Sequence, residues 1–160
     1  MAARAKPASK TAAAHAALIR EMFGRGMPRA MGVRIVALTG KKVTAEMPVK
    51  SMHLNRSGRI NGGALMAFAD VLGALGTIIN LLPGYRTTTL ESKTNFFAAG
   101  EGPVLKAVAA PLHLGRTTMV WQTTIKNSDG RKVALVTQTQ MVIPSESHAA
   151  PAKPKRSGKK

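Results

Sequence analysis

The longest apolar run in the chain covers residues 61–82, NGGALMAFADVLGALGTIINLL, and one carboxylate, Asp70, interrupts it. Its length and composition predict a helix that is buried nearly all round, and Pro83-Gly84 supplies a stop signal. An isolated carboxylate is rarely buried because desolvation of its charge is expensive. Asp70 therefore faces solvent, pairs with an arginine of a neighbouring strand, or acts in catalysis as an acid, base or nucleophile.

Alternation and β-branched residues predict strands on both sides of this helix. Two strands precede it and enclose Gly40-Lys41, which indicates a hairpin. Four strands follow it, and NSDG, residues 127–130, predicts the turn between the last two. Pro111 within one of them indicates an edge strand or a bulge. The expected strands are residues 33–39, 42–49, 87–97, 102–115, 116–127 and 132–143.

This order of elements predicts an α+β fold. A mostly antiparallel sheet of about six strands has one apolar face to cover, and an apolar helix has to be wrapped, so a curved sheet around one central helix satisfies both. We expect one domain over residues 11–143, beginning with a short helix at 11–23 and a loop rich in Gly and Pro. Residues 1–10 and 144–160 are predicted to be disordered basic tails, because they have little to bury.

The charge narrows the class of partner. The chain has 24 Lys and Arg against 7 Asp and Glu, a net charge of +17, and more than half of it lies outside the termini. An anionic partner is favoured: a phosphorylated cofactor, nucleic acid or an anionic membrane. The chain has no cysteine, which excludes a disulfide scaffold and suits a cytoplasmic protein. The acid and the glycines within residues 62–82 argue against a membrane span.

The start of the long helix is suited to binding an anion or a polarised carbonyl. Its first N–H groups lack intrahelical partners, and Gly62 and Gly63 have no side chain to keep a ligand away. Such an N–H can stabilise an oxyanion. Asp70 lies about 12 Å further along the helix axis, too far to act on the same carbonyl. In a dimer, Gly62 of one chain could meet Asp70 of the other.

The segment HLNRSGRINGGALMAFADVLGALG resembles the central segment of hotdog-fold acyl-CoA thioesterases of the PaaI-like, phenylacetate-degradation group. Their pattern has an Asn, a Gly-Gly pair, and an acid eight residues after the first Gly. The resemblance extends over residues 30–143 through TTTLESKTNFF, HLGRTTMVWQ and DGRKVALVTQTQMVI. It implies a helix wrapped by a six-stranded antiparallel sheet. It also implies a homodimer with shared active sites, often doubled to a homotetramer.

The resemblance also implies roles for four residues by position. Asp70 corresponds to the carboxylate that attacks the thioester or activates water. Gly62 corresponds to the oxyanion N–H donor, and Asn55 of the same chain to a side chain that assists at the thioester carbonyl. Thr89 falls where the family often has a hydroxyl that positions water beside the acid.

Further substrate contacts are expected around these residues. The turn Gly115-Arg116-Thr117 falls where the family often holds the phosphates or pantetheine of CoA. Arg116 is suited to binding a phosphate, although the interpretation that it is only a solvated turn residue is equally supported. Gly63 offers a second N–H at the helix start, and Asn61 just before the glycines is a further expected contact of the substrate. His53 either orients the substrate or is a loop histidine with an ordinary hydrogen bond.

The predicted function is hydrolysis of an acyl- or aryl-CoA thioester to a free acid and CoA, without a metal or a cofactor beyond the CoA of the substrate. One departure from the family pattern is Asn61, which replaces the usual histidine before Gly-Gly. Asparagine can cap the helix but cannot carry a proton as histidine does. A non-catalytic acyl-CoA-binding hotdog protein is therefore the alternative. Nucleic-acid binding is disfavoured because stacking aromatic residues are few.

Overall fold

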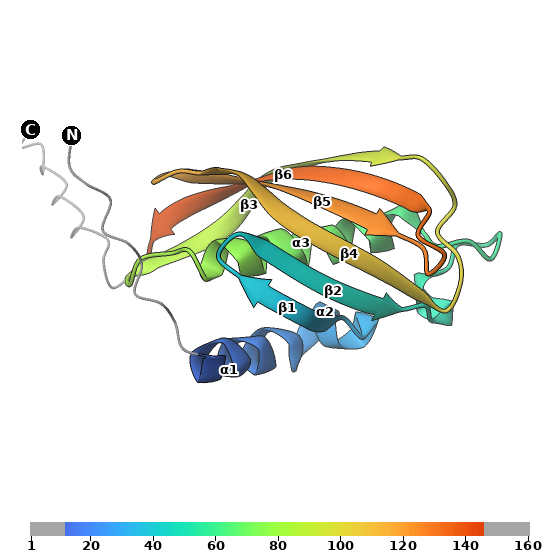
Figure 1. Cartoon of the computed structure of the whole chain (residues 1–160), viewed down its shortest axis with the longest axis horizontal. Helices are drawn as coiled ribbons and strands as arrows, with labels where there is room; N and C mark the ends of the chain where they lie inside the picture. The colour runs from blue at the N-terminus through green and yellow to red at the C-terminus, as the bar shows by residue number, and fades with distance from the viewer. Residues whose placement is uncertain (1–11, 146–160) are drawn as a thin grey trace, which may run out of the picture.

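A curved antiparallel sheet covers one long helix in the computed structural model, which describes residues 12–145 (Figure 1). The six strands follow the order β1-β2-β4-β5-β6-β3, and every neighbouring pair is antiparallel. This confirms the predicted sheet. The strands are β1 (Arg34–Thr39), β2 (Lys42–Pro48), β3 (Tyr85–Phe96), β4 (Val104–Leu114), β5 (Thr118–Lys126) and β6 (Lys132–Pro144).

The central helix, α3, spans Gly62–Ile78 and is shorter than the predicted 61–82. Asn61 caps its start, because the Asn61 side chain accepts a hydrogen bond from the Gly63 N–H at 2.8 Å. Asn80 closes its end: the side-chain amide donates to Gly76 O at 2.8 Å and to Gly40 O in the β1–β2 turn at 2.9 Å. Within residues 12–145 no helix combines the length and hydropathy that a membrane span requires.

The ends of the described chain refine the predicted boundaries. Helix α1 spans Ala12–Phe23, where the sequence predicts a short helix. The expected loop after it contains a second helix, α2 (Gly26–Met31), which stops at Gly32 in the left-handed conformation with φ of 76°. The 3₁₀ helix η1 (Ser51–His53) follows β2. Strand β6 reaches Pro144, and the Ser145 N–H donates to Gly84 O at 2.9 Å, so the predicted C-terminal tail begins too early. Residues 1–10 and 146–160 of the predicted tails lie outside the described residues.

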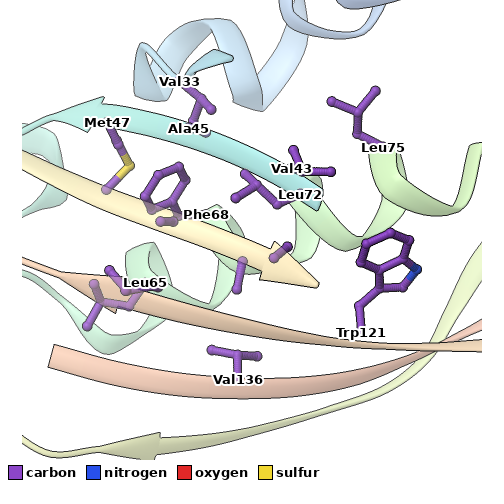
Figure 2. Packing of buried hydrophobic residues seen from close by; sticks show 14 of the residues in the cluster. Val33, Val43, Ala45, Met47, Leu65, Phe68, Leu72, Leu75, Trp121 and Val136 are labelled. Atoms are coloured by element: carbon purple, nitrogen blue, oxygen red, sulfur yellow. The ribbon is translucent and has the colours of Figure 1, made fainter. Parts of the chain in front are cut away.

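The core lies between the inner face of the sheet and α3, where large side chains interdigitate (Figure 2). Trp121 on β5 is fully buried, and its indole N–H donates to Thr77 Oγ1 at 2.9 Å. Gly76 makes this approach possible, because a Cβ there would lie 2.6 Å from Trp121 Cη2. The absence of a side chain at this helix position therefore sets how closely α3 packs on the sheet.

Two strands contain bulges that matter for the site. The β3–β6 register shifts between Thr89 and Glu91, so Leu90 is the extra residue in β3. The β4–β5 register shifts between Pro111 and His113. The predicted bulge at Pro111 is thus confirmed. Strand β4 is interior in the sheet order, but its pairing with β2 ends at Ala109, so Pro111 has no β2 partner and lies at a locally open edge.

One side of α3 is not covered by the sheet, contrary to the expectation of a helix buried nearly all round. Met66 is 38% exposed, and Ala67, Asp70, Val71 and Ala74 are partly exposed. Their helical spacing places them on one stripe, which we call the uncovered stripe. It borders β3, because Asp70 contacts a β3 side chain.

Strand β3 forms one edge of the sheet and carries exposed apolar side chains. Leu90 is 56% exposed, Phe96 is 53% exposed, and Phe97, just after the strand, is 58% exposed. A long edge strand with exposed apolar residues is a ready surface for pairing with another strand. The uncovered stripe of α3 and the β3 edge therefore form one continuous, partly apolar region.

Candidate active site

Asp70 lies near the middle of α3 and is partly exposed. Its Oδ1 atom accepts a hydrogen bond from Thr89 Oγ1 on β3 at 2.8 Å and one from Gln138 Nε2 on β6 at 3.3 Å. From the described residues, Oδ2 accepts no hydrogen bond and the carboxylate forms no ion pair. The expectation that Asp70 pairs with an arginine of a neighbouring strand is therefore wrong. The carboxylate has one anchored oxygen and one free oxygen.

Strands β3 and β6 together supply the donors to this carboxylate. Gln138 and Gln140 are two residues apart on β6, so both point to the face that α3 covers, and both are fully buried. The β3–β6 register places Thr89 opposite Gln140, whose Nε2 donates to Thr89 Oγ1 at 2.8 Å. A threonine hydroxyl has one hydrogen. Because Thr89 accepts from Gln140, that hydrogen is directed to Asp70.

The two glutamines were not among the predicted site residues, although the sequence contains a signal for them. In VTQTQ, alternation places Val136, Gln138 and Gln140 on one face of the strand. Because Val136 is buried, the alternation of the strand places the side-chain amides of Gln138 and Gln140 on the face that forms the core. Buried polar side chains need partners, and such positions are candidates for a polar network around the single acid of α3.

The start of α3 offers one free N–H group. The Gly63 N–H already donates to the Asn61 side chain. The Gly62 N–H makes no hydrogen bond to any described residue, and Gly62 is partly exposed. Phe96, another residue that was not predicted, packs here: a Cβ on Gly62 would lie 3.1 Å from Phe96 Cζ. Of the two glycines, Gly62 is therefore the one whose N–H is available to a ligand.

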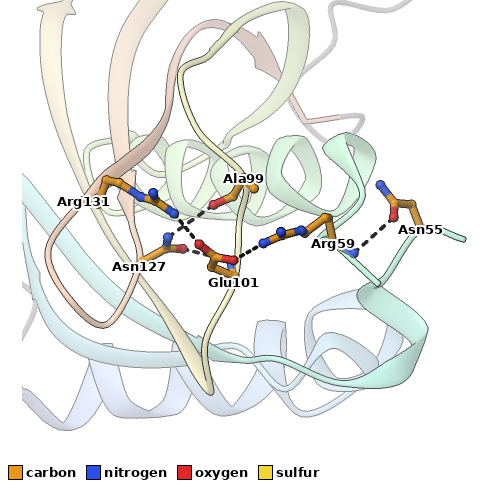
Figure 3. A network of polar contacts seen from close by, with 6 residues as sticks. All are labelled: Asn55, Arg59, Ala99, Glu101, Asn127 and Arg131. Atoms are coloured by element: carbon orange, nitrogen blue, oxygen red, sulfur yellow. Dashed lines mark hydrogen bonds and ion pairs between the residues drawn. The ribbon is translucent and has the colours of Figure 1, made fainter. Parts of the chain in front are cut away.

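Asn55 lies in the loop before α3, and its side-chain oxygen is used within the loop (Figure 3). Asn55 Oδ1 accepts hydrogen bonds from the Ser57 N–H at 2.9 Å and the Arg59 N–H at 3.1 Å. Its Nδ2 has no partner among residues 12–145, and the residue is exposed. The loop thus orients the amide with its N–H donors available, as assistance to a carbonyl would require.

A network centred on Glu101 holds this loop against two others (Figure 3). Arg59 binds Glu101 Oε2 and Arg131 binds Glu101 Oε1. The Glu101 N–H donates to Asn127 Oδ1 at 3.0 Å, and Asn127 Nδ2 donates to Ala99 O at 3.2 Å. We call this network the Glu101 clamp. It joins the loops before α3, after β3 and between β5 and β6.

His53 is 1% exposed and cannot present its ring to solvent. Its Nδ1 accepts a hydrogen bond from the Lys50 N–H at 3.2 Å, and its carbonyl accepts one from the Asn61 N–H at 2.8 Å. Burial, together with the charge of Lys50, lowers the pKa of His53 below its ordinary value of 6.5. These contacts correspond to the structural alternative for His53, a neutral residue beneath the helix start.

The predicted CoA-binding turn lies far from the helix start within one chain. Gly115, Arg116 and Thr117 connect β4 to β5 at the end of the sheet where α3 stops, whereas Gly62 lies at the opposite end (Figure 1). The Gly115 N–H donates to Thr118 O at 2.9 Å, which closes the turn and leaves Arg116 exposed. The structure therefore brings Asp70 to Thr89, but does not bring this turn to Gly62.

Comparisons with known proteins identify the family and agree with the fold. Residues 57–134 match the family model described as the thioesterase superfamily. PA1618 of Pseudomonas aeruginosa is 31% identical over 71% of this chain and 79% of its own length. The crystal structure of a mutant of that protein, described as a thioesterase, superposes with a TM-score of 0.76 over 81% of this chain and 94% of that one, at 28% identity.

Two further similar proteins are also described as thioesterases. The proofreading thioesterase EntH of Cronobacter turicensis is 30% identical over 64% of this chain and 74% of its own. A protein of Streptococcus pneumoniae, described as a hypothetical thioesterase and solved with coenzyme A, has a TM-score of 0.71 and 27% identity. The match covers 79% of this chain and 98% of that one.

Proposed function

This chain belongs to the thioesterase superfamily and is a thioester hydrolase, and from that premise we propose that it cleaves an acyl- or aryl-CoA thioester with Asp70 as the reacting carboxylate. The observation that carries the proposal is the free Oδ2 of Asp70 on the uncovered stripe, beside an anchored Oδ1. The coenzyme A bound to the streptococcal relative and the net charge of +17 support a CoA ester as the substrate.

The reaction can follow two routes from the same geometry. In the first, Oδ2 accepts a proton from a water molecule while that water attacks the thioester carbonyl. In the second, Oδ2 attacks the carbonyl itself, and water then hydrolyses the acyl–enzyme anhydride. In both, the free N–H of Gly62 stabilises the oxyanion and the Asn55 amide donates to the same oxygen. The thiolate of CoA takes its proton from Asp70 Oδ2 in the first route and from water in the second. Neither route needs a metal or a further cofactor.

A homodimer completes the site. Within one chain, Gly62 and Asp70 are about 12 Å apart along the helix, so they cannot act on one carbonyl. A second copy that pairs with the exposed β3 edge would cover the uncovered stripe as well, and would bring Gly62 of one protomer towards Asp70 of the other. It would also bring the turn with Arg116 to the end of the partner that holds Gly62. A homotetramer would be a dimer of such dimers.

The proposal is tested by measuring CoA release from a panel of aryl-, short-chain and long-chain acyl-CoAs with the parent protein and with Asp70→Asn. We expect turnover of at least one thioester, and a loss of about a hundredfold or more in kcat when the carboxylate becomes an amide. Circular dichroism and the thermal midpoint check that the variant folds. Turnover of the panel at the parental rate by Asp70→Asn would exclude Asp70 as the reacting group.

A further inference from the structure

Gln138 is fully buried, yet only half of its side-chain amide has partners. Its Nε2 donates to the main-chain oxygen of Asp70 and to Asp70 Oδ1, both at 3.3 Å. Its Oε1 is buried and accepts no hydrogen bond from the described residues. A buried carbonyl without a donor costs free energy, so a glutamine held in this way calls for a reason other than the stability of the core.

The orientation of this amide is set by Asp70. Rotating the amide by half a turn would place Oε1 against two oxygens of Asp70, so only the observed orientation gives donors to the acid. Helix α3 is shaped to receive it, because a Cβ on Gly73 would lie 2.5 Å from Gln138 Cδ. Strand and helix therefore both accommodate an amide that donates to Asp70.

Two donors then converge on the same carboxylate oxygen. Thr89, itself held by Gln140, and Gln138 both donate to Oδ1, and Oδ2 remains without a partner. A carboxylate on a short side chain otherwise turns broadly about its terminal torsion. We infer that Gln138 is a positioning residue that, together with Thr89, holds Oδ1 of Asp70 and so presents Oδ2 to the thioester. This inference rests on the proposed function, because it requires Asp70 to be the reacting acid.

The test is the near-isosteric variant Gln138→Met, which keeps the volume and removes the donors. We expect kcat for the best acyl-CoA to fall about tenfold or more, because a misplaced reacting group loses its attack geometry, while KM changes less than twofold. The thermal midpoint should stay level or rise, because the unpartnered buried Oε1 is gone. A purely structural glutamine would give the opposite result, a lower midpoint with an unchanged kcat.

Gln122→Met is the matched control, since Gln122 lies on the outer face of β5 and takes no part in this network. Gly73→Ala is the second variant: its methyl group displaces the same amide, and we expect a similar fall in kcat. The inference is overturned if Gln138→Met or Gly73→Ala keeps kcat within twofold of the parent, or if Gln122→Met lowers it equally. Asp70→Asn, measured beside them, separates the two proposals: if it alone loses activity, the proposed function stands and only the role of Gln138 fails.

Discussion

Two carboxylates, Asp70 on α3 and Glu101 in the loop after β3, each lie at the centre of a polar network. Both oxygens of Glu101 are bound by arginines, and its side chain is 43% exposed. Asp70 has no cationic partner in the described chain; neutral hydroxyl and amide donors converge on Oδ1 and leave Oδ2 free. The first network uses both carboxylate oxygens to hold three loops together, whereas in the second network one carboxylate oxygen has no partner among the described residues.

This difference indicates how to recognise a reacting acid on a strongly basic protein. Half of the acids within residues 12–145 form no ion pair: Asp70, Glu91 and Asp129. Of these three, Asp70 is the one that is partly buried and accepts hydrogen bonds from two side chains. Asp70 lies among apolar neighbours on the uncovered stripe, and no arginine of the described residues pairs with it. Amide and hydroxyl donors orient the acid without cancelling its charge, which suits catalysis better than stability.

The largest expected effect separates the two carboxylates by activity. Asp70→Asn should lower kcat/KM by about a hundredfold or more, since it removes the reacting group, with little change in the thermal midpoint. Glu101→Gln, the matched amide substitution in the clamp, should change kcat/KM by no more than a few-fold. Steady-state CoA release by both purified variants is the measurement. Equal losses in the two variants would contradict the comparison.

A second effect concerns stability beneath the acid, where Gly73 and Gly76 lie on adjacent turns of α3. Gly76→Ala should destabilise the fold by about 1–3 kcal/mol, because its Cβ would overlap the rigid indole of Trp121. In Gly73→Ala the new methyl group contacts only the end of the Gln138 side chain. The unfolding free energy should therefore fall less than in Gly76→Ala, whereas the activity should fall more. Urea unfolding of both variants gives the comparison, and the reverse order of stabilities would refute it.

A third effect is acid sensitivity at the clamp end of the molecule. His53 has a pKa lowered by burial, so the unfolded chain binds its proton more readily than the folded chain does. The free energy of unfolding should therefore fall as the pH drops from about 6.5 to the folded-state pKa of His53. It should recover when the pH is raised again to above about 6.5. His53→Asn should show a shallower fall between pH 7 and pH 5. Parallel pH curves for the variant and the parent would show that His53 is not the group responsible.

The smallest expected effect is the contribution of the Glu101 clamp to the free energy of unfolding. Its side chains are about half exposed, so Glu101→Gln should cost less than about 1 kcal/mol of unfolding free energy. Because exposed ion pairs are screened, the difference between variant and parent should shrink in 1 M salt. Chemical denaturation with urea at low and high salt measures this. A difference of several kcal/mol, or one unaffected by salt, would mean that the clamp acts as a buried pair.

Much of the fold is readable from the chain because it depends on neighbours in sequence. Alternation predicts the strands, the apolar run predicts α3, and Asn61 before two glycines predicts its capped start. The sequence predicts too late an end for α3, because Asn80 closes the helix through Gly40, a residue 40 positions away. The sequence does not predict helix α2, because Gly26 and Pro28 are typical of loops, although proline is tolerated in a first helical turn.

The sequence by itself determined the candidate acid and the helix start, since a lone Asp in an apolar helix and a Gly-Gly pair after Asn are local features. Only the tertiary structure decided what Asp70 touches. Its partners Thr89 and Gln138 are 19 and 68 residues away, and the β3–β6 register aligns Thr89 with Gln140. A slip of one residue in β6 would turn both glutamines outwards. Residue type therefore specified the chemistry, and strand register specified its geometry.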